Sequence, residues 1–185
     1  NIISGHGDPC GKVLTSHPKV ARVSFTGGPV SARHVIQNSA ENFAEVSLEL
    51  GGKSPFIVFA YADIESAVNG SVGGIFAATG QSCVAGSRLL LQEDIADEFI
   101  EKLVAVAKTV KIGDPMLDET EMGPLCTKGQ QDHIKREVAH AITEGATIRA
   151  GGAVPVGLEG IFFEPTIVNF LIFSALISLK EFLMI

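Results

Sequence analysis

The sequence predicts an α/β fold with a mainly parallel sheet, on the strength of two observations. Apolar runs of strand length alternate along the chain with stretches in which apolar residues recur at helical spacing. Glycine pairs at 27–28 and 51–52 follow early strand candidates, as tight turns at strand ends require. Because the second pair separates two strands, we expect a domain boundary close to residues 50–52.

The individual elements follow from local pattern. Strands are expected over residues 20–26, 46–50, 55–60 and 88–92 and near 145–150, with helices over 31–42, 64–78, 94–111 and 127–144. Residues 20–26 (VARVSFT) alternate and stop at the first glycine pair. Asp63 can accept hydrogen bonds from free backbone N–H groups, which predicts a helix start. Residues 94–111 place acids early and lysines late, as the helix dipole favours.

Composition excludes several function classes. Lysine and arginine number 14 against 21 aspartates and glutamates, so the net charge is −7 and the basic surface typical of nucleic-acid or anionic-membrane binding is missing. Three cysteines without a C-x-x-C motif indicate free thiols in a reducing compartment, which predicts a cytoplasmic protein. Partners are therefore expected to be small molecules or other protein chains.

The chain ends and the hydropathy predict a piece of a longer protein. The sequence starts without Met and without a signal-peptide pattern, and 46% of its residues are hydrophobic, with a mean hydropathy of +0.32. Residues 167–179 (IVNFLIFSALISL) are interrupted by polar residues and are shorter than the roughly 20 residues of a membrane helix. We expect them to form a buried element or an interface.

Five motifs occur in an order that resembles the aldehyde dehydrogenase superfamily. They are SFTGG (24–28), LELGGKSP (48–55), GQSC (80–83), GP (123–124) and FEPT (163–166). The resemblance covers nearly the whole chain but only the middle of a family member. It implies that residues 1–50 are the C-terminal part of a Rossmann-like NAD(P)-binding domain and residues 51–185 a truncated catalytic domain, incomplete at both ends.

The resemblance assigns the chemistry to Cys83 and Glu49. A thiolate is both a strong nucleophile toward an aldehyde and a good leaving group, and a carboxylate can accept a proton from water. The implied reaction oxidises an aldehyde to a carboxylic acid through a thiohemiacetal and a thioester on Cys83, with Glu49 as general base. Cys10 and Cys126 match no family motif and are interpreted as structural.

The resemblance implies cofactor contacts at Thr26, Gly27 and Gly28. By itself the pattern also fits an ordinary strand-turn-helix, although glycines let a backbone approach phosphate and a helix N-terminus favours anions. Many family members carry serine where this chain has Gly28. The resemblance also places Gln130 where members often contact the cofactor ribose. The cofactor is expected to be NAD or NADP, and the choice between them stays open.

Other family features are missing or altered. The asparagine that donates to the oxyanion in the family precedes residue 1, and the downstream Glu-x-Phe-Gly-Pro motif has at best Glu181 as its counterpart. The alternatives are a catalytically inert fragment and a CoA-acylating enzyme, although retention of Glu49 favours water as the acceptor. The five histidines lack zinc-ligand spacing, so no metal is predicted. The full-length parent is expected to be a homo-oligomer.

Overall fold

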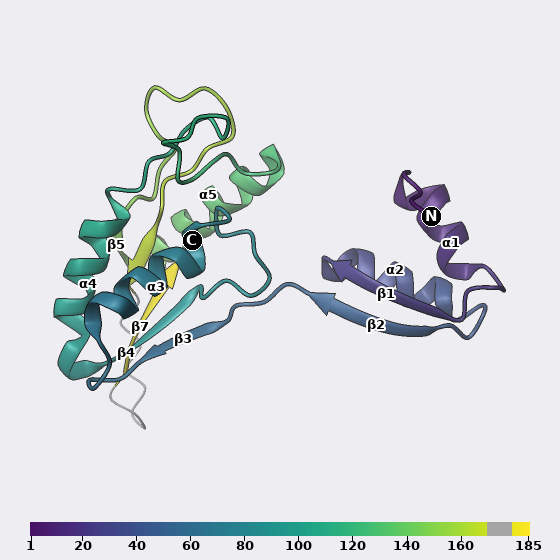
Figure 1. Cartoon of the computed structure of the whole chain (residues 1–185), viewed down its shortest axis with the longest axis horizontal. Coiled ribbons are helices and arrows are strands. Elements are labelled where there is room, and N and C mark those ends of the chain that lie inside the picture. The colour runs from purple at the N-terminus through teal and green to yellow at the C-terminus, as the bar shows by residue number, and fades with distance from the viewer. Residues whose placement is uncertain (170–178) are drawn as a thin grey trace. The chain divides into compact units, whose positions relative to one another are not determined.

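The computed structural model describes residues 1–169 and 179–185, and these form two compact units, Asn1–Gly52 and Lys53–Ile185 (Figure 1). Both units combine helices with a sheet, which confirms the predicted α/β class. The predicted roles of residues 1–50 and 51–185 stay predictions. Most of the apolar run that was expected to be buried lies outside the described residues.

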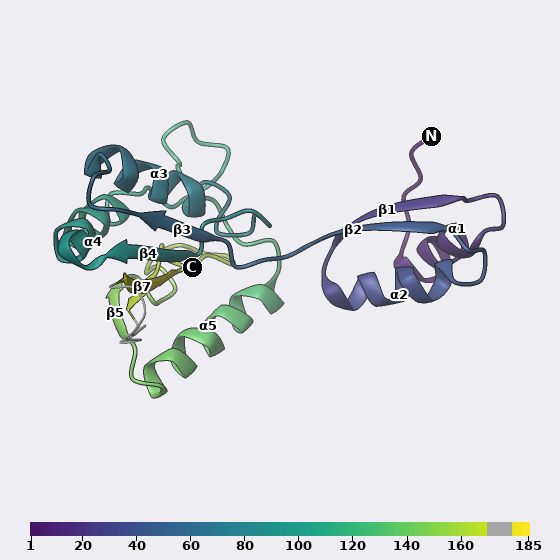
Figure 2. The same ribbon diagram turned by 90° about the horizontal axis from the view of Figure 1, so that it is seen from below.

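The first unit is a parallel strand pair with helices on one face (Figure 2). Its elements are a helical turn at Gly7–Gly11, α1 (Lys12–Ser16), β1 (Arg22–Gly27), α2 (Pro29–Ser39) and β2 (Glu45–Leu50). The predicted strands at 20–26 and 46–50 and the helix between them are confirmed. The sequence predicts no helix before residue 20, because the glycines and the proline of residues 5–11 hide any helical period in so short an element.

Polar contacts hold α1 against α2. The Asn38 side-chain amide donates to the Thr15 hydroxyl at 3.1 Å, and the Ser39 hydroxyl donates to the Thr15 carbonyl at 3.4 Å. The Asn42 amide donates to the backbone carbonyls of His17 at 2.7 Å and Val20 at 3.1 Å. These bonds position the segment between α1 and β1 relative to α2.

The second unit contains a mixed sheet. Its elements are β3 (Pro55–Val58), α3 (Ile64–Phe76), β4 (Arg88–Gln92), α4 (Glu93–Ala107), α5 (Lys128–Thr143), β5 (Thr147–Ala150), β6 (Ile167–Asn169) and β7 (Leu179–Met184). Within the described residues the strand order is β3-β4-β7-β6-β5. β3 and β4 are parallel, whereas β4–β7, β7–β6 and β6–β5 are antiparallel.

The prediction of a mainly parallel sheet is therefore wrong for this unit. A crossover helix, α3, joins β3 to β4 and makes that pair parallel, as helical crossovers do. No helix lies between β5 and β6, and these strands pair antiparallel instead, as does β7 with β6 and with β4. Hydrophobic alternation is the same for both directions, so the sequence pattern could not distinguish them.

Helices cover both faces of this sheet (Figure 2). Leu89 and Leu91 of β4 are fully buried on the face that carries α3 and α4, where they join Phe99 and Leu103 in the main core. α5 lies on the other face. Its buried residues Ile134, Val138 and Ala141 pack near half-buried side chains of the sheet, Ile148 among them. The alternation along β4 thus divides the core into two layers.

Asp63 begins α3 as predicted. Its carboxylate accepts from the Ser66 backbone N–H at 2.8 Å, and the hydrogen bonds from Ser66 lower the pKa of this carboxyl below its ordinary value of 3.8. A carboxyl whose pKa falls on folding stabilises the fold above the unfolded-state pKa and loses that effect as the pH falls through the folded-state pKa.

The ionised cap can be tested with Asp63→Asn, which keeps a capping oxygen but carries no charge. The parent should melt at a higher temperature than the variant at pH 6, and the difference should shrink as the pH is lowered from about 5 to below 3.8. Thermal melts followed by circular dichroism at several pH values measure it. A difference that is independent of pH would contradict a role for the charge.

Gly151 occupies a position that only glycine fits. Its φ is +63°, and a Cβ there would lie 2.3 Å from the Pro165 carbonyl oxygen. We expect Gly151→Ala to destabilise the chain by more than the roughly 1–3 kcal/mol of a left-handed backbone alone. Gly157→Ala is the matched control, because Gly157 has a φ of +84° but no atom within 4 Å of the added Cβ. Equal losses in urea unfolding would show that the contact with Pro165 has no effect.

Candidate active site

The carboxyl ends of β1 and β2 bring two groups of predicted site residues together. In the parallel register Thr26 lies opposite Glu49, and Gly27 lies opposite Leu50. Thr26 and Glu49 are both exposed. In parallel α/β sheets ligands bind at this edge, because the loops that leave the strands open there. A predicted cofactor contact and the predicted base are therefore neighbours within the first unit.

The N-terminus of α2 starts directly after these glycines. Gly28 is the N-cap residue with extended backbone, Pro29 takes the first helical position, and no side chain caps the helix. The first backbone N–H groups of a helix have no intrahelical partner, and the helix dipole adds partial positive charge. The exposed Gly28 and Ser31 leave this end open to an anion.

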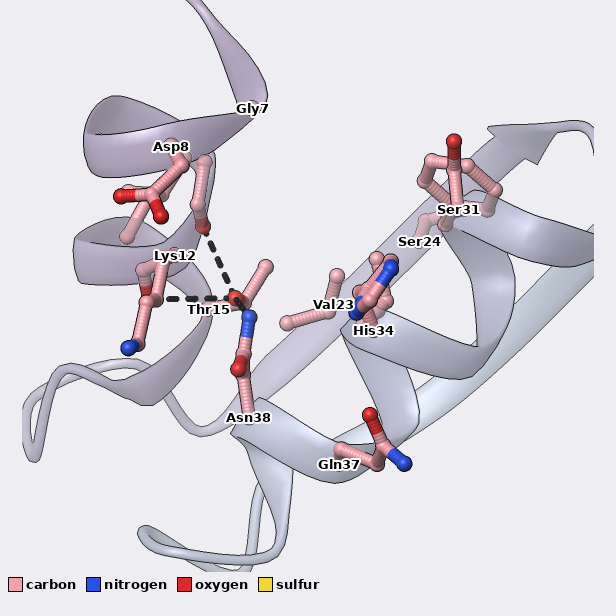
Figure 3. A pocket seen from close by; sticks show the side chains of 14 residues that line it. Gly7, Asp8, Lys12, Thr15, Val23, Ser24, Ser31, His34, Gln37 and Asn38 are labelled. Atoms are coloured by element: carbon pink, nitrogen blue, oxygen red, sulfur yellow. Dashed lines mark hydrogen bonds between the residues drawn. The ribbon is translucent and has the colours of Figure 1, made fainter.

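A pocket of about 840 Å³ lies beside this helix end in the first unit (Figure 3). Asp8, Lys12 and Thr15 of the N-terminal helical segment line one side, and Ser31 and His34 of α2 line the other. Residues 23–25 of β1 complete the lining, so the pocket ends next to Thr26. Its volume suits a small-molecule ligand of nucleoside size or larger.

Cys83 lies on an exposed loop between α3 and β4, in the second unit. The last turn of α3 holds both ends of this loop. The Gly80 N–H donates to the Ile75 carbonyl at 3.0 Å, and the Gly86 N–H donates to the Gly74 carbonyl at 3.3 Å. The loop thus closes on the helix end and presents the Cys83 thiol at its surface.

Gln130 lies on the first turn of α5 and shares a small pocket with the Cys83 loop. Gly80 and Gln81 line this pocket of about 200 Å³ together with Gln130. The Ser87 hydroxyl also lines it, and this side chain is 6% exposed with no hydrogen-bond partner among the described residues. The structure therefore brings the predicted ribose contact close to the loop that bears the thiol.

Lys53 and His133 also line this pocket, and the sequence patterns did not single them out as site residues. Lys53 is part of the quoted LELGGKSP motif, which could have signalled it. His133 lies one helical turn after Gln130, and its imidazole is 3.5 Å from the Glu137 carboxylate. Its position one turn after Gln130 on the same helix face could have identified His133 as a neighbour of the predicted ribose contact.

The remaining candidates have separate positions. Glu181 lies in β7, where it pairs with Leu90. Cys10, Cys83 and Cys126 are all free thiols, as expected. Within residues 1–169 and 179–185, no His, Cys, Asp and Glu side chains cluster in a way that could hold a metal ion. Helices in these ranges are too short or too polar to cross a membrane.

Most of the chain resembles known dehydrogenases. A sequence profile described as the aldehyde dehydrogenase family matches residues 1–175. A dehydrogenase of Acinetobacter baylyi, named for (Z)-2-((N-methylformamido)methylene)-5-hydroxybutyrolactone, is 54% identical over 169 residues, which are 91% of this chain and 34% of that protein. The chloroplastic betaine aldehyde dehydrogenase of Beta vulgaris is 45% identical over 91% of this chain and 34% of its own length.

Solved structures agree with the sequence comparisons. PnpE in complex with nicotinamide adenine dinucleotide is 43% identical, with a TM-score of 0.85 over 89% of this chain and 34% of PnpE. Betaine aldehyde dehydrogenase from Staphylococcus aureus, in complex with NAD+, is 41% identical with a TM-score of 0.85, over 90% of this chain and 34% of the enzyme. The chain spans about a third of the length of the relatives it matches. On the profile match over residues 1–175, the chain belongs to the aldehyde dehydrogenase family.

Proposed function

We propose that these 185 residues supply the thiol nucleophile, the general base and part of the cofactor site of an NAD(P)-dependent aldehyde dehydrogenase. The observation that carries this proposal is the exposed Cys83 loop, which shares a pocket with Gln130. The substrate is a small aldehyde and the product its carboxylic acid. From the family resemblance we also propose that the complete enzyme is a homo-oligomer, and the free thiols suit the cytoplasm.

The first unit fits the larger part of a dinucleotide. The pocket between the N-terminal helical segment and α2 has room for a nucleoside, and the open N-terminus of α2 can bind a phosphate through backbone N–H groups. Thr26, Gly27 and Gly28 follow directly after the β1 residues that line this pocket and lead into the N-terminus of α2. The smaller pocket of the second unit has room only for a group of sugar size, which suits Gln130 as a ribose contact.

Cys83 forms the covalent bond to the substrate in the first step and is released as a thiolate in the last. Its thiolate adds to the aldehyde carbon, and the former carbonyl oxygen becomes an oxyanion to which the Cys83 backbone N–H can donate. NAD(P)+, when bound, accepts the hydride that this carbon loses. The resulting thioester is attacked by water as Glu49 accepts a proton from that water, and the carbon–sulfur bond breaks to release the acid and the thiolate.

Separate variants distinguish the nucleophile role of Cys83 from the base role of Glu49. They are made in a full-length enzyme that contains these 185 residues. Cys83→Ser should lower kcat by a factor of about 10³ or more, because a serine hydroxyl is a far weaker nucleophile at neutral pH. Glu49→Gln should retain a first burst of NAD(P)H but lose steady turnover, because thioester formation does not require the base. Stopped-flow absorbance at 340 nm measures both. Unchanged turnover in Cys83→Ser would refute the proposal.

The phosphate role of the α2 N-terminus is testable at Gly28, where an added Cβ meets no atom within 4 Å. Gly28→Asp should weaken NAD(P) binding about tenfold or more, because its carboxylate would occupy and neutralise the anion site. Gly28→Asn is the matched control, since it caps the helix in the same way without charge.

Both Gly28 variants should melt at or slightly above the parent's temperature, because aspartate and asparagine are good N-cap residues. Calorimetric titration with NAD(P) then separates binding from stability. Equal affinities of the Asp and Asn variants would show that no phosphate lies at this helix end.

A further inference from the structure

The loop that carries Cys83 has an unusual conformation at its start. Thr79 has a φ of +52°, and Gly80 follows with a φ of +67°. A left-handed backbone is uncommon for a β-branched residue and persists only where surrounding contacts hold it. The Thr79 N–H donates to the Phe76 carbonyl at 3.0 Å, so the strained residue closes the end of α3.

The Gln81 side chain contacts both this strained residue and a distant segment. Its Nε2 donates to the Thr79 hydroxyl, and its Oε1 accepts from the Cys126 backbone N–H at 3.0 Å. Cys126 lies in the segment that leads into α5, 45 residues further along the chain. Gln81 thus links the start of the Cys83 loop to the entry of α5.

This link differs in kind from the other bonds of the loop. Gly80 and Gly86 bond back to α3, and the Ala85 N–H donates to the Ser82 carbonyl at 3.2 Å, so these bonds are local. Among the hydrogen bonds of the described residues, the one that the Gln81 side-chain Oε1 accepts joins residues 80–85 to the entry of α5. Gln130 lies on the first turn of that helix.

We propose that Gln81 is a positioning residue for Cys83, whose side-chain amide ties the thiol loop to the entry of α5. Through this tie the spacing between the Cys83 loop and Gln130 is set. The role of Gln81 in turnover rests on the proposed function, whereas the tie itself does not.

The test compares Gln81→Met with Gln92→Met in the 185-residue chain with Cys10→Ser and Cys126→Ser, which leaves Cys83 as the one thiol. Methionine keeps the length of glutamine and removes both hydrogen bonds. Gln92 is a matched control within the same unit. Its Oε1 also accepts from a backbone N–H, that of Ala60 at 2.9 Å, and its Nε2 also donates to a side chain, that of Asp94 at 3.4 Å.

The measured quantity is the rate of iodoacetamide labelling of Cys83 at a pH where the thiol is fully ionised. We expect Gln81→Met to change the labelling rate of Cys83 about threefold or more, because the untied loop shifts the exposed thiol relative to the groups that surround it, and Gln92→Met to label at the parent's rate. Both variants should melt close to the parent. A Gln81→Met rate within threefold of the parent, or an equal change in Gln92→Met, would overturn the proposal.

Two further measurements keep the proposal testable if Gln81→Met does not fold. The backbone N–H of residue 126 should exchange with solvent more slowly than in an unfolded peptide, although the residue is exposed. Gln81→Glu should preserve that protection, since its carboxylate still accepts. Exchange of this N–H at the unfolded rate in the parent would refute the tie.

The labelling result is independent of dehydrogenase activity. If Cys83→Ser left turnover unchanged, the proposed function would fail while the labelling comparison could still stand. If the labelling rates were equal, the positioning role would fail while Cys83 could still be the nucleophile. In a full-length chain, Gln81→Met should lower kcat, whereas Gln92→Met should leave both kcat and the KM for NAD(P) unchanged.

Discussion

Burial of the apolar face of α4 against β4 determines where the Cys83 loop lies. Leu89, Leu91 and Phe99 are fully buried in one cluster with the apolar residues of α3. Removing a buried leucine or phenylalanine typically costs about 2–5 kcal/mol, whereas one exposed hydrogen bond contributes about 1 kcal/mol. The core therefore places the end of α3, and the hydrogen bonds of Gly80, Gly86 and Gln81 adjust the loop that starts there.

A second constraint acts in the first unit, where the parallel pairing of β1 and β2 sets the register of Thr26 and Glu49. A shift by one residue would turn every side chain of a strand to the other face. The helix between the strands begins at Gly28, so its free N–H groups open at the same edge. Backbone geometry alone thus gathers the Glu49 carboxylate, two glycines and a helix N-terminus.

The two pockets differ in the kind of ligand they suit. The first-unit pocket is lined from two helices and a strand and is large enough for a nucleoside. The second-unit pocket is small, and it contains the unpartnered hydroxyl of Ser87 beside polar groups from the Cys83 loop and α5. Size and polarity thus suit a nucleoside-sized group in the first-unit pocket and a smaller polar group in the second-unit pocket.

Local pattern by itself determined most elements, and the resemblance of short motifs to the family led to the proposal of Cys83 and Glu49 as reactive residues. The glycine pair after residues 20–26, the cap at Asp63 and the GQSC motif act over a few residues, and short-range sequence reports such features directly. Tertiary structure alone decided the strand directions around β7, the short helix α1 and the contact of Gln81 with Cys126. Strand direction and a bond across 45 residues depend on how distant segments pack, and hydrophobic alternation is identical for the competing arrangements.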